Sequence, residues 1–264
     1  MAGLPSSVLA ALRRQARQVA ARSYVPYSNR PEGAVLLLRD GQLVPGARVE
    51  SATFSLTIPP LLNAFTTAVA AGRNDVTAAV LSRPATPGET AFMTSTPAGP
   101  FQLAEEDVFL PAKDTDQAEP SGFLSPLLDL PVPRTPAGGM DLARAVARRA
   151  HVPGSRFPVG CVLVTEQGLV PGVNVEHEDW TRILCAERNA LGTAISYGLT
   201  GLHTMYLTCL RDPQGTPCGA CRQLLTEQAP ALVLWMDRGD APPASATPEA
   251  LLPGFFSGRT LRST

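Results

Sequence analysis

Residues 185–188 read Cys-Ala-Glu-Arg, and residues 217–221 read Pro-Cys-Gly-Ala-Cys. The cysteines in these stretches are Cys185, Cys218 and Cys221. A catalytic zinc ion takes three protein ligands and keeps a fourth position for water, and these thiols supply that number. Glu187 lies two residues after the first thiol, where it can exchange protons with a molecule held at the open position. The two stretches therefore predict a metal site with one free corner.

Two other interpretations remain open from the residues alone. Cys218 and Cys221 could form a redox dithiol or half of a structural zinc site. A closed structural site needs a fourth cysteine or histidine at short spacing, and none stands near Cys185. A redox pair would leave Cys185 and Glu187 without a role. The open catalytic site is the interpretation that uses all four residues.

Both ligand segments are expected at the N-termini of helices. Cys218 and Cys221 are three residues apart, so both can face the same ion from one side of a helix. The amide dipoles of a helix N-terminus favour ionised sulfur. Three thiolates exceed the charge of a divalent zinc by one, and Arg188 could offset this by hydrogen bonding to a ligand sulfur. The alternative for Arg188 is an ordinary surface cation.

The composition argues against several classes of protein. The chain has 264 residues, 17% of them charged, and a formal net charge of −1, which gives no basic face for nucleic acid. Arginines 13, 14 and 17 interrupt the opening stretch where a signal peptide would be apolar, and no apolar run reaches membrane-spanning length. An odd number of cysteines, three of them wanted as thiolates, favours a reducing cytoplasm.

The first half of the chain is a weaker copy of the second. Residues 25–33 align with residues 152–160 at an offset of 127, with five of nine positions identical. Leu-Val-Pro-Gly at residues 43–46 recurs at residues 169–172. A repeat of this length predicts two domains. We expect a degenerate domain at residues 1–120, a proline-rich linker at 121–139 and a catalytic domain at 140–264.

The apolar periodicity predicts an α/β fold in each copy, a mixed β-sheet sandwiched by helices. Each copy should begin with an amphipathic helix, capped in the second copy by Asp141. Strands are expected at residues 34–38, 159–164, 204–209 and 231–236, and helices at 185–197 and 218–228.

In the alignment of the two repeats, Cys-Ala-Glu at residues 185–187 corresponds to Pro-Pro-Leu at residues 59–61. The segment at residues 216–221 is matched in the same way to residues 96–101. The first half contains no cysteine or histidine. We therefore expect one zinc ion per chain, in the second half.

The motif Cys-Ala-Glu-Arg followed by Pro-Cys-Gly-Ala-Cys-Arg-Gln resembles the cytidine deaminases of the three-cysteine zinc type. The resemblance implies a hydrolase acting on the C–N bond of a cyclic amidine, which converts free cytidine or deoxycytidine to uridine or deoxyuridine plus ammonia in pyrimidine salvage. Glu187 would serve as the proton shuttle, and Arg188 would hydrogen bond to ligand sulfur. Alternatives are a deaminase of a modified cytosine nucleoside or nucleoside antibiotic, and a zinc-stabilised interaction protein.

The resemblance also implies a set of substrate-binding residues. Asn174 and Glu176 match the pair that holds the ribose hydroxyls, and residues two apart on a strand do share a face. Phe157 matches an aromatic of the nucleoside pocket, and Ala186 lies between the first ligand and the acid. Phe256 matches an aromatic that closes over the base from a neighbouring subunit. From the residues alone, Asn174 and Glu176 could equally be a solvated strand edge, and Phe256 a core residue.

The second copy departs from the family after Glu176. It reads His-Glu-Asp-Trp at residues 177–180 where the family has Asn-Ala-x-Tyr, whereas the first copy, Glu-Ser-Ala-Thr-Phe at residues 50–54, is closer. In single-domain relatives that alanine and aromatic reach an adjacent subunit. We therefore expect Ala52 and Phe54 to help complete the site built on Cys185.

Relatives of this kind assemble as tetramers of single domains or dimers of doubled ones, so we expect a homodimer that forms a pseudo-tetramer. Its partner molecule should be a small nucleoside, without nucleic acid or membrane. The remaining cysteines and histidines are expected to be structural, although His177 could touch substrate; they are Cys161, Cys209, His151, His177 and His203.

Overall fold

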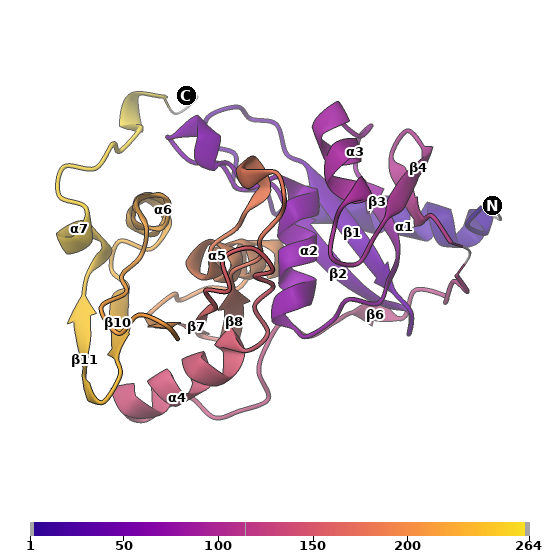
Figure 1. Cartoon of the computed structure of the whole chain (residues 1–264). Coiled ribbons are helices and arrows are strands. Elements are labelled where there is room, and N and C mark those ends of the chain that lie inside the picture. Colours follow the sequence, from indigo (N-terminus) through magenta and orange to yellow (C-terminus); the bar gives the residue numbers. More distant parts are fainter. Residues whose placement is uncertain (1–2, 114, 262–264) are drawn as a thin grey trace.

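The computed structural model describes residues 3–113 and 115–261. Each half of the chain forms one β-sheet with helices on both faces, and the two halves lie side by side (Figure 1). The predicted α/β architecture of two tandem domains is thus confirmed. Within the described ranges, no helix is long and apolar enough to cross a membrane.

The first half is built around a central strand, β1, in a sheet of order β4-β5-β3-β1-β2-β6. Val35 and Leu37 of β1 face α1, whereas Leu36 and Leu38 face α2, so the strand is buried along its whole length. The elements are α1 (Ser6–Ala20), β1 (Gly33–Leu38), β2 (Gln42–Ala47), η1 (Phe54–Leu56), α2 (Pro60–Ala70), β3 (Val76–Leu81), α3 (Pro87–Thr94), β4 (Phe101–Glu105), β5 (Val108–Pro111) and β6 (Gly122–Phe123).

The second half repeats this plan with a sheet of order β11-β10-β9-β7-β8. Val162 and Val164 of β7 pack with α4, and Cys161 and Leu163 with α5. The elements are α4 (Pro136–Ala147), β7 (Val159–Thr165), β8 (Gly168–Val173), η2 (Trp180–Arg182), α5 (Ala186–Tyr197), β9 (Thr204–Cys209), α6 (Gly219–Gln228), β10 (Val233–Arg238), β11 (Ala241–Ala246), α7 (Pro248–Leu251) and η3 (Arg259–Leu261).

The two sheets differ beyond their third strand. In the second half, β10 runs parallel to β9 and is followed by the edge strand β11. In the first half the chain passes to the edge strand β4 first and returns as β5, which runs antiparallel to β3. The repeat therefore holds for the helices α1 and α2 and the strands β1 to β3, and the copies diverge after that.

The boundary between the halves takes part in both sheets. β6 pairs with β2 of the first sheet, and Leu128 forms a bridge with Leu169 of the second. α4 begins at Pro136, inside the segment expected to be a linker. The domain limits at residues 120 and 140 remain a prediction. Residues 1, 2, 114 and 262–264 of the expected domains lie outside the described ranges.

The expectation that Asp141 caps the first helix of the second half is wrong. The N-cap of α4 is Thr135, whose hydroxyl accepts a hydrogen bond from the Gly138 backbone N–H at 3.2 Å. Pro136 takes the first helical position, where its missing N–H is not needed. Asp141 lies inside the helix and pairs with Arg144 at 3.2 Å.

The two halves are joined by α2 and α5, which pack against each other at the centre of the molecule (Figure 1). The hydroxyls of Thr67 and Thr193 share a hydrogen bond of 2.7 Å across this interface. The Asn63 amide donates to the Ser196 hydroxyl at 3.0 Å and to the Gly192 carbonyl at 3.1 Å. One hydrophobic core runs through both halves around this helix pair.

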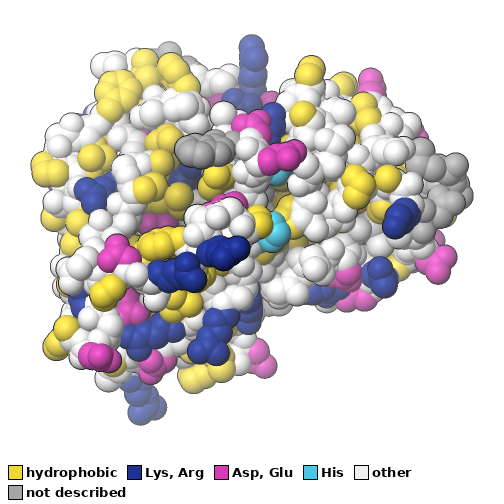
Figure 2. Space-filling model, in the orientation of Figure 1, with side chains coloured by type: hydrophobic (Ala, Val, Ile, Leu, Met, Phe, Trp, Pro, Cys, Tyr) yellow, Lys and Arg dark blue, Asp and Glu magenta, His cyan; other side chains and the backbone are white. Residues whose placement is uncertain are grey.

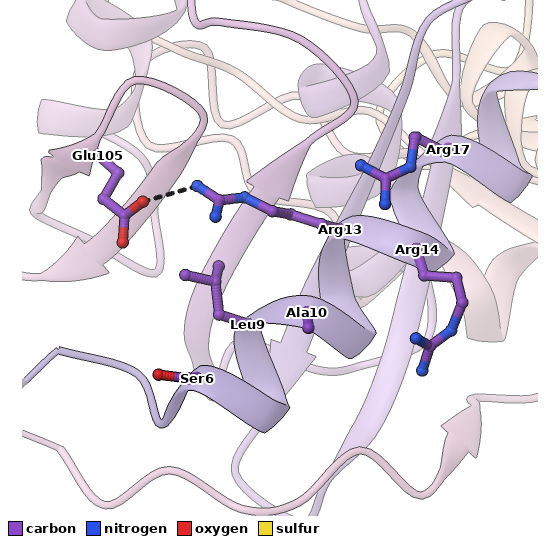
Figure 3. A pocket seen from close by; sticks show the side chains of 7 residues that line it. All are labelled: Ser6, Leu9, Ala10, Arg13, Arg14, Arg17 and Glu105. Atoms are coloured by element: carbon purple, nitrogen blue, oxygen red, sulfur yellow. Dashed lines mark hydrogen bonds and ion pairs between the residues drawn. The ribbon is translucent and has the colours of Figure 1, made fainter.

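Each half also ties its first helix to its sheet with an arginine–aspartate pair. Arg13 on α1 donates two hydrogen bonds to Asp107, at 2.7 and 2.6 Å. A third, to Glu105, is drawn in Figure 3. Arg144 on α4 donates two to Asp237, at 2.7 and 2.6 Å. Burial alone would raise the pKa of Asp237, but hydrogen bonds from Arg144 and other donors outweigh it and hold that pKa below its usual value.

Replacing Asp237 by asparagine should lower the free energy of unfolding by about 1–3 kcal/mol at about pH 7. Because the folded-state pKa is depressed, this stabilisation exists above the unfolded-state pKa and is lost as the pH falls through the folded-state value. Urea unfolding at neutral pH and at about pH 3 should therefore show a difference that shrinks on acidification. Asp141→Asn, at an exposed carboxylate, is the control and should change little. An equal loss at both pH values would contradict this explanation.

Candidate active site

Two helix N-termini meet beside the second sheet. Cys185 is the N-cap of α5 and Cys218 the N-cap of α6, so the predicted helices begin within one residue of the expected positions. A Cβ at Gly172 on β8 would lie 2.3 Å from the Ala186 carbonyl oxygen, so only glycine allows the strand to approach the first turn of α5. Gly46 has the same relation to the Pro60 carbonyl oxygen at 2.1 Å, which explains why the glycine of Leu-Val-Pro-Gly is repeated.

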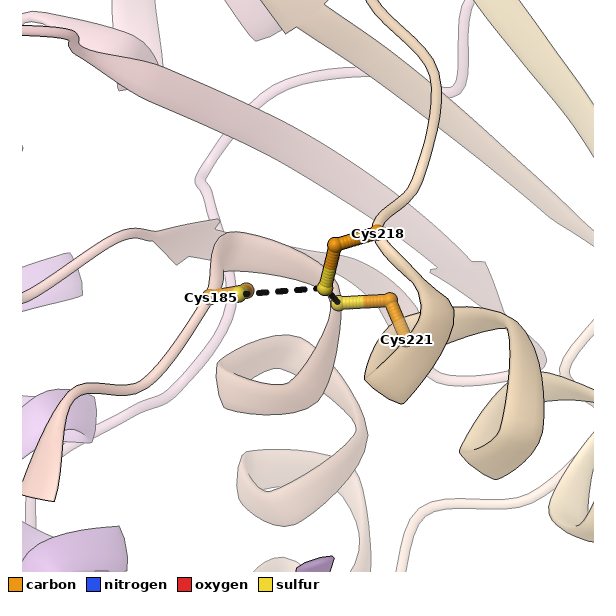
Figure 4. A group of neighbouring side chains, drawn as sticks. All are labelled: Cys185, Cys218 and Cys221. Carbon is orange, nitrogen blue, oxygen red and sulfur yellow. Dashed lines mark hydrogen bonds between the residues drawn. The ribbon is translucent and has the colours of Figure 1, made fainter. Parts of the chain in front are cut away.

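Cys185, Cys218 and Cys221 point their sulfur atoms toward one another (Figure 4). The Sγ atoms of Cys185 and Cys218 are 3.6 Å apart, and those of Cys218 and Cys221 are 3.5 Å apart. Zinc–sulfur bonds of about 2.3 Å in tetrahedral geometry place sulfurs about 3.8 Å apart. The arrangement therefore fits a zinc ion with little movement. Within the described ranges, these three residues form the only such group of possible ligands.

The charge of the sulfur group is unevenly distributed. Hydrogen bonds with Cys185 and Cys221 lower the pKa of the Cys218 thiol. The pKa of Cys185 is raised, first by its hydrogen bond with Cys218, and the pKa of Cys221 is raised first by burial. A divalent cation at the centre supplies the positive charge that allows all three thiols to ionise.

Glu187 lies in the first turn of α5 and is only 3% exposed. The pKa of its carboxyl is raised to about 7, first by burial and then by the charge of Cys218, against hydrogen bonds and the charge of Arg188, which lower it. A carboxyl with a pKa near neutrality can both take and give a proton. The position and environment of Glu187 suit the proton shuttle expected from the sequence.

Arg188 connects this site to the first half of the chain. Its Nη2 donates a hydrogen bond of 2.8 Å to the backbone carbonyl of Leu56 in η1. Its Nε atom is buried, and no hydrogen-bond partner for it exists among the described residues. No hydrogen bond from Arg188 to a ligand sulfur is found among the described residues, so that role of Arg188 stays a prediction.

The residues expected to hold the ribose are engaged with their own domain. The Asn174 side chain accepts from the Val159 backbone N–H at 2.8 Å and donates to the Phe157 carbonyl at 2.9 Å. Glu176 Oε2 accepts from the backbone N–H groups of Gly154 and Ser155 at 2.9 and 3.1 Å. These contacts fix the loop that carries Phe157.

Glu176 lines a cavity of about 750 Å³, together with Gly154, His177, Glu178 and Ile183. His177 also reaches the first half. Its ring is tilted by 36° against that of Phe92, with the centroids 5.1 Å apart, and its Nε2 is 3.0 Å from the Ser95 hydroxyl.

Phe54 and Phe256 are both largely exposed, at 72% and 55%. Phe54 belongs to the same turn as Leu56, and the carbonyl of Phe256 accepts a hydrogen bond of 2.8 Å from Gln223 on α6. Ala186 is fully buried in the first turn of α5. Gln223 and its neighbour Glu227 were not singled out by the sequence, and their spacing of four on a predicted helix was the only available signal.

One part of the repeat alignment is wrong. In chain order α3 follows β3 in the same way that α6 follows β9. The Thr-Pro pair at residues 86–87, at the start of α3, therefore corresponds to the Thr-Pro pair at residues 216–217, just before α6. Residues 96–101 instead come after α3 and enter β4. The prediction of a single metal site per chain does not depend on this correction, because the first half has no cysteine or histidine in either alignment.

Three thiols at two helix N-termini, beside a buried acid on an α/β sandwich, define a zinc enzyme. Comparison with known proteins gives the family. The model described as the cytidine and deoxycytidylate deaminase zinc-binding region matches residues 135–236, and a second model of that description matches residues 4–86. The chain belongs to the cytidine deaminase family and contains two copies of its domain.

Named relatives match about half of the chain. A cytidine deaminase from Sporosarcina psychrophila is 33% identical over 132 residues, which are 46% of this chain and 96% of that protein. A probable cytidine deaminase from Dictyostelium discoideum is 36% identical over 124 residues, 46% of this chain and 84% of that protein. The crystal structure of cytidine deaminase from Burkholderia pseudomallei is 30% identical, covers 46% of this chain and 99% of that one, and gives a TM-score of 0.43.

Replacing Cys185 by alanine should weaken zinc binding by more than about 100-fold, because loss of a direct ligand costs more than loss of an outer partner. Atomic absorption after dialysis should then find one zinc per chain in the parent and almost none in the variant. Cys209→Ala is the matched control, since Cys209 lies outside the sulfur group, and it should keep its zinc. Retention of a full equivalent by Cys185→Ala would refute the ligand assignment.

Proposed function

We propose that the chain catalyses hydrolytic deamination of free cytidine and deoxycytidine, giving uridine or deoxyuridine and ammonia. The observation that carries the proposal is the open group of three thiols with Glu187 buried beside it. When bound, zinc supplies a Lewis acid that lowers the pKa of water enough for attack on C4 of the pyrimidine at neutral pH.

The chain's own part in the reaction is proton transfer and positioning. Glu187 takes a proton from the attacking water and delivers it to ring N3. Glu187 next takes the proton of the hydroxyl group now on C4 and passes it to the departing amine, so that the C4–N4 bond breaks, ammonia leaves and the C4 carbonyl of uridine forms. Arg188 offsets the extra negative charge of three thiolates through its Nε donor. Phe157, Asn174, Glu176 and Ala186 form the nucleoside-binding wall.

The first half contributes to this site through Ala52 and Phe54. The support is the hydrogen bond from Arg188, next to the catalytic acid, to Leu56 in the same turn as Phe54. The closing aromatic Phe256 and the exposed Phe54 also lie where a second copy of the chain could cover them. We therefore propose a homodimer, and Figure 2 shows hydrophobic side chains gathered at the corner where the C-terminal segment lies.

A cytoplasmic location is proposed because all five cysteines are free thiols, which a reducing compartment preserves.

A second candidate substrate is a modified cytosine nucleoside. The sequence difference that favours it is Gly154, which lines the cavity beside Glu176 and stands where the first half has Tyr27. Incubation with cytidine, deoxycytidine and single-stranded DNA, followed by ultraviolet absorbance, tests the proposal. Loss of absorbance with the two nucleosides but not with DNA is expected, and turnover of DNA alone would overturn it.

Glu187→Gln should keep zinc and lose turnover by roughly 10²- to 10⁴-fold, the usual contribution of proton-transfer catalysis. The amide has the size of the carboxyl but cannot shuttle a proton. Steady-state kinetics and zinc content should be measured on the same preparation. Near-normal turnover in a zinc-loaded variant would end the assignment of Glu187.

Phe54→Ala should lower kcat/KM by about 3- to 10-fold, the value of one aromatic contact. Leu130→Ala removes a similarly exposed apolar side chain and serves as the control. If both variants retain the parent's kcat/KM, Phe54 has no part in the active site.

A further inference from the structure

One carboxylate on α6, that of Glu227, holds a segment of the first half. It accepts hydrogen bonds from the Ser51 hydroxyl at 2.8 Å, the Ala52 backbone N–H at 3.0 Å and the Tyr27 hydroxyl at 3.4 Å. Hydrogen bonds to an ionised acceptor are stronger than neutral ones. These contacts fix the start of residues 51–56, here named the docking segment, against the second half.

The other end of the docking segment is held by a different helix. Arg188 on α5 donates to the carbonyl of Leu56 at 2.8 Å. The segment therefore spans from α6 to α5, the two helices that carry the sulfur ligands. Between its two fixed ends lies Phe54, which is 72% exposed.

The C-terminal tail is held at the same point. Gln223 donates from its amide to Glu227 at 2.5 Å and to the Phe256 carbonyl at 2.8 Å. A Cβ on Gly258 would lie 2.5 Å from the Cβ of Ala52, so the tail runs directly against the docking segment. Both exposed aromatics, Phe54 and Phe256, are thus carried by chain segments that converge on Glu227.

We propose that Glu227 is a positioning residue that holds the docking segment and, through Gln223, the C-terminal tail in place for substrate binding. The inference rests on the proposed function and assigns to the first half a specific point of attachment. Among the described residues of the first half, the acid of α3 makes no equivalent contact. Glu89 binds Arg83 and caps its own helix, and α3 meets the second half through Phe92 and the adjoining Ser95.

The test is Glu227→Gln in the full-length, zinc-loaded protein. The amide keeps the shape of the side chain but offers one acceptor oxygen where two are used, so kcat/KM should fall by roughly 10- to 100-fold, mainly through a higher KM. Zinc content should stay at one per chain. Glu249→Gln, at an exposed carboxylate of α7, should behave as the parent does.

A double-mutant cycle separates positioning from general destabilisation. If Glu227 acts through the docking segment, Ser51→Ala should also raise KM, and the two changes together should cost less than the sum of their separate effects. Additive effects, or a kcat/KM within twofold of the parent in zinc-loaded Glu227→Gln, would overturn the proposal. If Glu227→Gln does not fold, the KM of Ser51→Ala alone tests the proposal, and an unchanged KM would overturn it.

Hydrogen–deuterium exchange tests the docking without relying on activity. In Glu227→Gln the Ala52 amide should exchange about 10-fold faster, while the β1 amides stay as protected as in the parent. An unchanged rate at Ala52 would refute the docking. A parent without activity on any cytosine nucleoside would instead refute the proposed function, and the exchange result would then decide the docking alone.

Discussion

The packing of α2 against α5 determines how the rest of the molecule is arranged. These helices meet through Thr67 and Thr193, equivalent positions of the two copies that share one hydrogen bond. Because the contact joins equivalent positions, the loop after the second strand of each half reaches the other half. Leu56 accepts a hydrogen bond from Arg188 on α5, and His177 lies against Ser95 at the end of α3.

The two sites that this symmetry creates have diverged. In the second half, helix N-termini present three thiols and an acid, groups that a metal can stabilise. In the first half, prolines occupy the start of α2, and α3 is capped by Thr86 and Glu89 in a capping box. The N-terminus of α3 is thus satisfied by side chains without a metal, and the first half contributes a docking segment instead. The first half can hold the docking segment in place without metal ligands of its own. The segment is attached through one hydroxyl and two backbone groups, those of Ser51, Ala52 and Leu56.

The sequence was sufficient for elements whose pattern is local. The helix at residues 186–197 and the strand at 204–209 were predicted closely, because apolar periodicity and the ligand motif agree there. The cap of α4 was misplaced because Thr135 and Pro136, a standard helix start, lay in a segment interpreted as a linker. The alignment at residues 96–101 failed because the connection around α3 changes length between the copies. The grouping of Glu227 with Ser51 could not be predicted, since it depends on tertiary contact between distant segments.

X-ray absorption at the zinc edge of the purified protein tests the central claim most directly. The account predicts one zinc per chain with three sulfur neighbours at about 2.3 Å and one lighter oxygen or nitrogen neighbour at about 2.0 Å. Four sulfur neighbours would indicate a closed structural site, and fewer than three would exclude the grouping of Cys185, Cys218 and Cys221. Either result would contradict the account of an open catalytic metal in the second half.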